Sequence, residues 1–403
     1  MVQYEFFGDL TLAPKDEMND LKIKLENCQS SKVDVSAGVY RGENGESYTL
    51  SSVKAAKGVL HANDPGHDYN FTLGIKNFNS MAADIIFGKD ISTGGYIATC
   101  QTISGTGACS IAIKFLVDCC KLTNFYIGTP TWPNYAPMIK AANAEVVEYV
   151  HYNPLTRSLD FESVLEAISK AKMHSVFILQ LCCHNPTGTD FSIDQWKILA
   201  DKMQEKKIMP VFDSAYQGFG SGDIAVDAKP IRLYYAKGLQ FLVCQSFSKN
   251  LGLYSERVGA LHVVVCEKKL AEIVSDQLRS IFRRECSSAP AYGARLAVII
   301  ANDPKLTEQW RNDLRTIYKR LVDKRIELHD LLIKYQTPGS FDHLLNQNGL
   351  FWFSGLSKVQ CKLLVEEYHI FIPSNGRVNI AGLNNSNIHY FAKSFSEVIK
   401  ISV

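Results

Sequence analysis

The sequence predicts an α/β protein with two parts: a large domain whose mostly parallel sheet is covered by helices, and a smaller, discontinuous α+β domain. Two observations carry this prediction. Across residues 96–266, short apolar runs alternate with amphipathic segments, and a repeated β-then-α order favours a parallel sheet covered by helices. After Pro290 this alternation stops, and one long helical pattern leads into a short mixed segment.

The individual elements follow from periodicity along the chain. Apolar runs predict strands at 96–103, 124–127, 145–152, 176–182, 208–213, 241–246 and 260–266. Amphipathic stretches predict helices at 107–121, 160–170, 194–206 and 307–332, and a proline-rich loop is expected at 130–137. The segments 350–355, 359–368 and 377–381 form the expected small C-terminal unit. The first forty or so residues fit the sheet poorly, so we expect them to pack with that unit.

Composition excludes several classes of protein. The 403 residues carry a net charge of +2, from 43 basic and 41 acidic side chains, which gives no field for nucleic acid. No apolar stretch is long enough to span a membrane, and the N-terminus does not resemble a signal peptide. The eleven cysteines are scattered and form no paired zinc motif. We therefore expect a reduced, cytoplasmic protein that binds no metal, membrane or nucleic acid.

A lysine motif follows the expected strand 241–246. Lys249 is preceded by the hydroxyls of Ser246 and Ser248 and followed by Arg257. A dianionic phosphate needs such hydroxyl donors and a guanidinium fork, and lysine forms Schiff bases with carbonyl cofactors. A lone lysine beyond a strand is usually solvated, so the prediction of a pyridoxal phosphate site rests on the combination.

Two neighbouring strands end on polar residues that suit the same cofactor. Asp213 follows four apolar residues, and it either caps a turn or faces the ring nitrogen of pyridoxal phosphate, where an acid keeps the ring an electron sink. Asn185, in the His-Asn-Pro-Thr-Gly turn 184–188, either simply ends a strand or donates its amide to a phenolate oxygen.

A glycine-rich turn, Ser-Gly-Thr-Gly-Ala at 104–108, follows the strand 96–103 and begins a helix. Such a turn lets the backbone approach a phosphate, although an ordinary capped helix would look the same. A dinucleotide fingerprint would also need an acid after the next strand, and residues 124–129 contain none. No P-loop sequence occurs.

Three further residues are candidate ligand-binding residues, and each could instead have an ordinary structural role. Trp132 lies at a strand end, where it either joins the core or stacks on a planar ring. Arg377 begins an apolar strand, where it is either solvated or clamps a carboxylate in a bidentate pair. Arg283, with its neighbour Arg284, is either a second carboxylate ligand or part of a charge pair at a helix C-terminus.

Together these motifs resemble the class I aminotransferases, specifically their aspartate branch, over nearly the whole chain. The resemblance rests on AGVYR at 37–41, DY at 68–69, SGTGA at 104–108, TWPN at 131–134, HNPTG at 184–188, FDSAYQGF at 212–219, QSFSKNLGLYSERVG at 245–259, GAR at 293–295 and GR at 376–377. It implies a fold type I pyridoxal-phosphate-dependent transferase.

The resemblance also implies a role for each matching residue. Lys249 would form the internal aldimine and act as the acid–base group, with Asp213 on the pyridinium nitrogen. Arg283 would bind the distal carboxylate across a dimer interface. The remaining roles fall into four groups: Asn185 and Tyr216 on the ring oxygen; Trp132 on the ring face; Ser104, Gly105, Thr106, Ser246, Ser248, Arg257 and the partner subunit's Tyr69 on the phosphate; Gly38 and Arg377 on the substrate α-carboxylate.

The implied activity is a reversible ping-pong transamination of L-aspartate and 2-oxoglutarate to oxaloacetate and L-glutamate by a homodimer with shared active sites. The implied parts are an N-terminal arm (1–12), a small domain (13–45 and 315–403) and a large cofactor-binding domain (46–314). Two positions depart from the family, which commonly has histidine where this chain has Tyr135 and Gln180. Both are expected behind Asp213, where they would tune the ring nitrogen.

Other functions remain open from the sequence. An aromatic or broad-specificity class I aminotransferase would need only that Arg283 swing aside. A pyridoxal phosphate lyase or decarboxylase could use the same scaffold. A cofactor-binding sensor would usually need an attached DNA-binding or partner domain, and no segment of this sequence suggests one.

Overall fold

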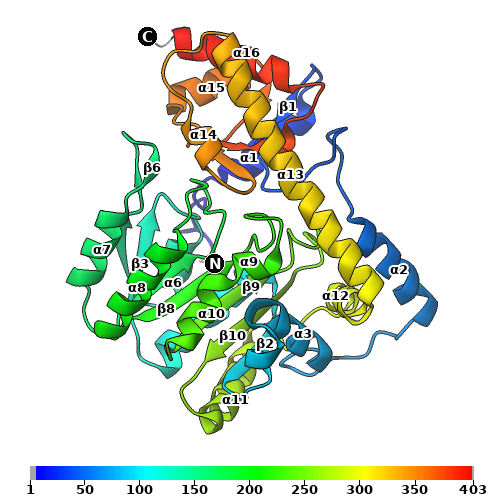
Figure 1. Cartoon of the computed structure of the whole chain (residues 1–403), viewed down its shortest axis with the longest axis vertical. Helices are drawn as coiled ribbons and strands as arrows, with labels where there is room; N and C mark the ends of the chain where they lie inside the picture. Colours follow the sequence, from blue (N-terminus) through cyan, green and yellow to red (C-terminus); the bar gives the residue numbers. More distant parts are fainter. Residues whose placement is uncertain (1–5, 402–403) are drawn as a thin grey trace, which may run out of the picture.

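A seven-stranded sheet forms the centre of the larger part of the chain in the computed structural model, which describes residues 6–401 (Figure 1). The strand order is β2-β10-β9-β8-β7-β3-β4. β10 runs antiparallel to both of its neighbours, and every other neighbouring pair is parallel, which confirms the predicted sheet. The strands are β2 (Ile97–Ile103), β3 (Asn124–Thr129), β4 (Glu145–Val150), β7 (Val176–Gln180), β8 (Met209–Ser214), β9 (Phe241–Ser246) and β10 (Val258–Val264).

Helices cover both faces of this sheet because its strands are apolar on both sides. Neighbouring residues of β7 illustrate this: Phe177 packs into one core and Ile178 into the other. One face is covered by α5 (Ser104–Lys114), α6 (Tyr135–Ala141) and α11 (Lys268–Glu285), and the opposite face by α3 (Lys76–Phe87), α7 (Phe161–Lys170), α8 (Ile193–Glu205) and α10 (Lys229–Ala236).

Side-chain caps explain where several helices begin. The carboxylate of Asp160 accepts the backbone N–H of Ser163 at the start of α7. Ser192 and Gln195 form a capping box at the start of α8, in which each side chain satisfies a backbone donor of the other residue. These starts lie within a residue or two of the predicted ones.

Two predicted segments differ from the structure. The helix expected at 107–121 begins earlier, at Ser104, and continues beyond α5 as a π-helical turn, η1 (Phe115–Cys119). The expected proline-rich loop contains α6, because Pro137 lies in its first turn, where a missing N–H costs no helical hydrogen bond. Three proline residues in eight had made this stretch look irregular.

A second, smaller part is joined to the first by α13 (Pro304–Lys334), the long yellow helix in Figure 1. N-terminal and C-terminal segments pair here: β1 (Val33–Asp34) runs parallel to β12 (Ile370–Phe371), and β11 (Phe351–Phe353) runs antiparallel to β13 (Arg377–Asn379). The helices nearby are α1 (Glu17–Asn27), α14 (His343–Asn346), α15 (Lys358–Glu366), η2 (Ile380–Gly382) and α16 (Ile388–Ile401).

The remaining elements are α2 (Ser51–Asn63), α4 (Lys89–Ser92), β5 (Tyr152–Asn153), β6 (Ser158–Leu159), α9 (Ile224–Asp227) and α12 (Tyr292–Asn302). Of these, α2 and α12 pack against α13, and α9 packs against α3 and α10. Within residues 6–401, no helix combines the length and apolarity needed to cross a membrane. The eleven cysteines are all free thiols.

Candidate active site

The motifs selected from the sequence meet at the carboxyl ends of the central strands, where ligands bind in open α/β sheets. Asp213 lies near the end of β8, and Lys249 follows β9. Together with residues from the ends of β2, β3 and β7, they line a cavity of about 170 Å³. The predicted residues that line it are Gly38, Ser104, Gly105, Thr106, Trp132, Asn185, Asp213, Tyr216, Ser246, Ser248, Lys249 and Arg257.

A cluster of hydroxyl groups beside a guanidinium group lines part of the cavity, and we call it the anion cradle (Ser104, Ser246, Ser248 and Arg257). The Ser104 hydroxyl lies 3.1 Å from that of Ser246 and 2.7 Å from that of Ser248. Nη1 of Arg257 donates to the Ser248 hydroxyl at 3.4 Å. A Cβ on Gly105 would lie 3.0 Å from Cβ of Ser246, so glycine keeps this corner open. These donors suit an anion with several oxygens.

A buried carboxylate with one free oxygen, that of Asp213, also lines the cavity. The Tyr135 hydroxyl donates to Oδ2 of Asp213 at 2.5 Å. Oδ1 of Asp213 is buried and has no hydrogen-bond partner within the described residues. Burial raises the pKa of Asp213, and the hydrogen bond from Tyr135, the nearby Lys249 ammonium and a hydrogen bond from the Cys109 thiol oppose this rise. An unsatisfied buried acceptor in a cavity is a position where a ligand's N–H would bind.

Lys249 lines the same cavity as the hydroxyl groups and the buried carboxylate. Its Nζ is 4.5 Å from the centre of the Tyr216 ring. Burial, reinforced by the charges of Arg257 and Arg377, lowers the pKa of Lys249 to about 8, although Asp213 partly offsets the effect. Burial disfavours the cation, so much more of this amine is neutral and nucleophilic near neutral pH than in a solvated lysine.

Asn185 connects the cavity to the smaller part of the chain. Its side-chain Oδ1 accepts from Nη1 of Arg377 at 3.0 Å, which leaves its amide N–H groups to other acceptors. Nη2 of Arg377 donates to the Ser36 carbonyl at 2.8 Å, and its guanidinium carbon lies 4.2 Å from the centre of the Phe351 ring. Arg377 is thus held in place beside Asn185, which lines the cavity, although Arg377 itself does not.

Tyr135 and Gln180, the two positions at which the sequence departs from the motifs it resembles, have different surroundings. Tyr135 is hydrogen-bonded to Asp213, as described above. Gln180 is opposite Asp213 in the β7–β8 register, but its amide donates to the Asn185 carbonyl at 3.0 Å and accepts from the Asn185 N–H at 2.8 Å. Gln180 therefore braces the turn that carries Asn185, and the expectation that it acts behind Asp213 does not match these contacts.

Besides Arg377, two predicted residues do not line the cavity of this chain. The side chain of Tyr69 is 95% exposed. Arg283 is exposed near the end of α11, where its Nη1 donates to the Ser287 hydroxyl at 2.8 Å. Neither lines the cavity formed by the rest of the motifs.

Sequence reasoning missed two residues that line the cavity, Ala215 and Tyr254. Tyr254 lies between Lys249 and Arg257, and its hydroxyl accepts the backbone N–H of Tyr40 at 2.8 Å. Its place inside the motif 245–259 was the available signal, but an isolated tyrosine in a loop has no chemistry that distinguishes it from a core residue.

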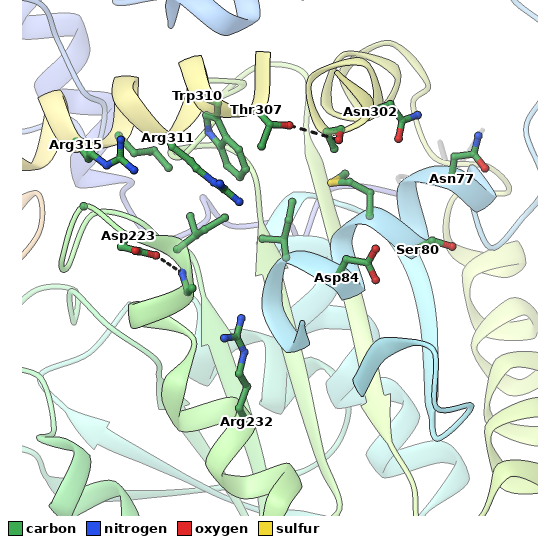
Figure 2. A pocket seen from close by; sticks show the side chains of 17 residues that line it. Asn77, Ser80, Asp84, Asp223, Arg232, Asn302, Thr307, Trp310, Arg311 and Arg315 are labelled. Atoms are coloured by element: carbon green, nitrogen blue, oxygen red, sulfur yellow. Dashed lines mark hydrogen bonds between the residues drawn. The ribbon is translucent and has the colours of Figure 1, made fainter. Parts of the chain in front are cut away.

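A larger cavity, of about 710 Å³, lies elsewhere, between α3, α9 and α13 (Figure 2). Arg232 and Arg311 extend toward it, and Asp84 and Asp223 lie on its walls. Its charges are therefore of both signs. None of the described residues that line it is a lysine, cysteine or histidine. The smaller cavity, with a low-pKa amine and converging donors, is the better candidate for chemistry.

Comparison with known proteins identifies the family. A family profile described as aminotransferase class I and II matches residues 30–395. The chain belongs to the class I and II aminotransferases. It is 38% identical to the cytoplasmic aspartate aminotransferase of Saccharomyces cerevisiae, over 98% of this chain and 97% of that one. The solved structure of that yeast protein superposes with a TM-score of 0.96, at 37% identity, and covers 99% of each chain.

A second solved structure bears on the cofactor. It is an aromatic-amino-acid aminotransferase from Burkholderia pseudomallei, covalently bound to pyridoxal phosphate, with a TM-score of 0.95, 30% identity and coverage of 98% of this chain and 100% of that one. The family depends on pyridoxal phosphate, as the sequence predicted. The residues present fit this group, since the hydroxyl cluster suits its phosphate and the free Oδ1 of Asp213 suits a ring N–H.

Proposed function

We propose that this aminotransferase is an aspartate aminotransferase, which converts L-aspartate and 2-oxoglutarate reversibly to oxaloacetate and L-glutamate by a ping-pong mechanism. One observation carries the proposal: the amine of Lys249, with a pKa lowered to about 8, lines the same cavity as the anion cradle and the buried carboxylate of Asp213. Aspartate aminotransferases that align over 98% of the chain support the choice of substrates.

The resemblance to the family and the lining of the cavity support the following cofactor-binding roles. Lys249 would hold the cofactor, and Asp213 would accept from its ring N–H. The amide of Asn185 and the hydroxyl of Tyr216 would bind the ring oxygen, and Trp132 would cover the ring face. The phosphate would be bound by Ser104, Gly105, Thr106, Ser246, Ser248 and Arg257.

Pyridoxal phosphate supplies an electron sink that acidifies the substrate Cα–H. The chain supplies the proton transfers and the orientation. Nζ of Lys249, when neutral, would take the proton from the substrate Cα and would then donate it, as a general acid, to the cofactor carbon that is bonded to the substrate nitrogen. Asp213 would keep the ring nitrogen protonated by holding a negative charge beside it. Arg377 and the backbone at Gly38 bind the α-carboxylate.

The residue that binds the second carboxylate of the substrate distinguishes an aspartate aminotransferase from related aminotransferases. Arg283 is exposed and outside the cavity of its own chain, so we assign it to the active site of a partner subunit. Burying a neutral side chain against its guanidinium group would leave a charge unpaired, which disfavours such substrates. The alternative is an aromatic or broad-specificity enzyme, which the similarity to a broad-specificity aminotransferase from Leishmania mexicana supports.

A shared active site requires a homodimer, and several exposed apolar side chains suit one. Phe6, Phe7, Leu10 and Leu12 are each at least 76% exposed, as expected of an arm (1–12) that embraces a partner; residues 1–5 of that arm lie outside the described residues. We assign 13–45 and 315–403 to a small domain and 46–314 to a large domain. Relatives named cytoplasmic, beside mitochondrial and chloroplastic ones, favour a cytoplasmic location.

Two substitutions test the proposal, with kcat/KM measured for aspartate and for phenylalanine. Lys249→Ala should lower both by at least about a thousandfold, since it removes a general base and the covalent anchor. Arg283→Ala should lower the aspartate value by about a hundredfold, the usual effect of unpairing a buried charge, and spare phenylalanine. Arg284→Ala, the adjacent exposed arginine, is the matched control.

Activity that survives in Lys249→Ala would refute the aminotransferase mechanism at this site. An unchanged aspartate preference in Arg283→Ala would refute only the role of Arg283 and favour the broad-specificity alternative.

A further inference from the structure

Tyr135 is a fully buried side chain whose hydroxyl bonds to the carboxylate at the base of the cavity. It lies at the start of α6, and only 1% of its surface is exposed. Its hydroxyl donates to Oδ2 of Asp213 at 2.5 Å, a short distance typical of a bond between a hydroxyl and an ionised acceptor. Its ring edge packs against Trp132, with ring centres 5.1 Å apart at 85°.

The surroundings of Asp213 make this bond important. Of its two oxygens, Oδ2 is used by Tyr135, and Oδ1 is buried and unpartnered within residues 6–401. The other titratable groups that face it are the amine of Lys249 and the thiol of Cys109 on α5, which also hydrogen-bonds the carboxyl group; both lower the pKa of Asp213, and less than Tyr135 does. Cys244 on β9 lies behind Cys109. Since burial favours the neutral acid, a fixed donor is needed to favour the carboxylate.

A phenol is suited to this task because it does not change charge near neutral pH. Burial and the Asp213 carboxylate both raise the pKa of Tyr135 further, so the hydroxyl keeps its proton and remains a donor. Because the buried Tyr135 hydroxyl has a single acceptor, its orientation is defined. The hydrogen bond therefore also determines which oxygen of Asp213 is left to accept from a ligand.

We infer that Tyr135 is a positioning residue that acts through Asp213: its hydroxyl engages Oδ2, favours the ionised carboxylate and leaves Oδ1 as the acceptor for the ring N–H of the cofactor. The inference rests on the proposed function only for the identity of that ring. A purely structural role would be different, because the hydroxyl would then stabilise the fold without affecting any property specific to a ring nitrogen.

The test compares two ligands on apoprotein variants by equilibrium binding, so it does not depend on turnover. One ligand is pyridoxal phosphate, and the other is its analogue with carbon in place of the ring nitrogen. Tyr135→Phe should weaken binding of pyridoxal phosphate about tenfold or more, the effect of losing a hydrogen bond to a charged group. It should leave binding of the analogue within about twofold, because the analogue has no N–H for Asp213.

Two further variants control the comparison. Tyr234→Phe removes the hydroxyl of another buried tyrosine, which donates to Sδ of Met203 at 3.9 Å, and it should change neither affinity. Tyr135→His keeps an N–H donor and should retain most of the preference for pyridoxal phosphate. Circular dichroism of each apoprotein checks the fold, and Tyr135→His provides the comparison if Tyr135→Phe does not fold.

Equal losses for the two ligands in Tyr135→Phe, or no loss at all, would overturn the inference. Loss of the preference for pyridoxal phosphate in Tyr135→His would overturn it as well, because donation to Asp213 would then not be the cause. A wild-type apoprotein that bound neither ligand would instead overturn the proposed function.

Discussion

Lys249 shows how burial changes the chemistry of one common residue. In water its amine would be charged at neutral pH, but in the cavity its pKa is lowered to about 8. The main cause is desolvation of the cation, and Asp213 prevents a larger fall. The sequence indicated which lysine to examine, whereas the shift depends on side chains that the fold brings around it.

This shift predicts when the amine becomes reactive. In the apoprotein, Lys249 should acetylate with a rate that rises with pH to a midpoint near 8, because only the neutral amine reacts. Competitive acetylation followed by mass spectrometry of the peptides measures that midpoint for every lysine at once. Ordinary lysines titrate near about 10.4, and a midpoint for Lys249 in that range would contradict the prediction.

At the scale of elements, close contact between β10 and its neighbours shapes the anion cradle. A Cβ on Gly259 of β10 would lie 2.5 Å from the carbonyl carbon of Ser104 and 2.6 Å from the carbonyl oxygen of Gln245. Both are backbone atoms, so neither can move without displacing its strand or turn. Ser104 and Ser246 therefore come within hydrogen-bond distance because this position has no side chain.

Gly259→Ala should destabilise the apoprotein by about 1–3 kcal/mol, as overpacking of a core does, and weaken pyridoxal phosphate binding by displacing Ser104. Gly58→Ala is the control: Gly58 lies on an exposed face of α2 with open space around it, so alanine should stabilise the helix by about 0.5–1 kcal/mol. Urea unfolding measures both, and equal stability of the two variants would argue against the close contact.

At the scale of the whole molecule, the proposed substrate site is incomplete within one chain. The residues proposed to bind the cofactor, apart from Tyr69, line one cavity, and Arg377 is hydrogen-bonded to Asn185 of that cavity. Tyr69 and Arg283 are exposed elsewhere on its surface. A two-fold dimer would use one patch on both subunits and complete two sites together.

Hybrid dimers test this arrangement. Mixing Lys249→Ala with Arg283→Ala subunits should restore about a quarter of wild-type aspartate activity, because half of the dimers are hybrids and each hybrid has one intact site. Mixing Lys249→Ala with Asp213→Asn should restore none, since both residues line the cavity of the same chain. Recovery in both mixtures, or in neither, would contradict a site shared in this way.

The sequence by itself determined the class of fold and the identity of most cavity residues. Strand and helix positions followed because apolar periodicity reflects which faces are buried, a local property of the chain. Pro137 was misleading because proline is tolerated in a first helical turn, which periodicity cannot distinguish from a loop. Lys249, Asp213 and Asn185 could be selected because each follows an apolar strand.

Only the tertiary structure decided how these residues act together. Nothing in the spacing of Tyr135 and Asp213, or of Asn185 and Arg377, indicates the hydrogen bonds that join them. Such bonds form between elements distant in sequence, and burial then changes the pKa values of the groups that meet. The sequence determines which chemical groups are present. The packing of β7, β8, β9, α6 and β13 determines which of these groups contact one another, because their separation and their removal from water are set only when the chain folds.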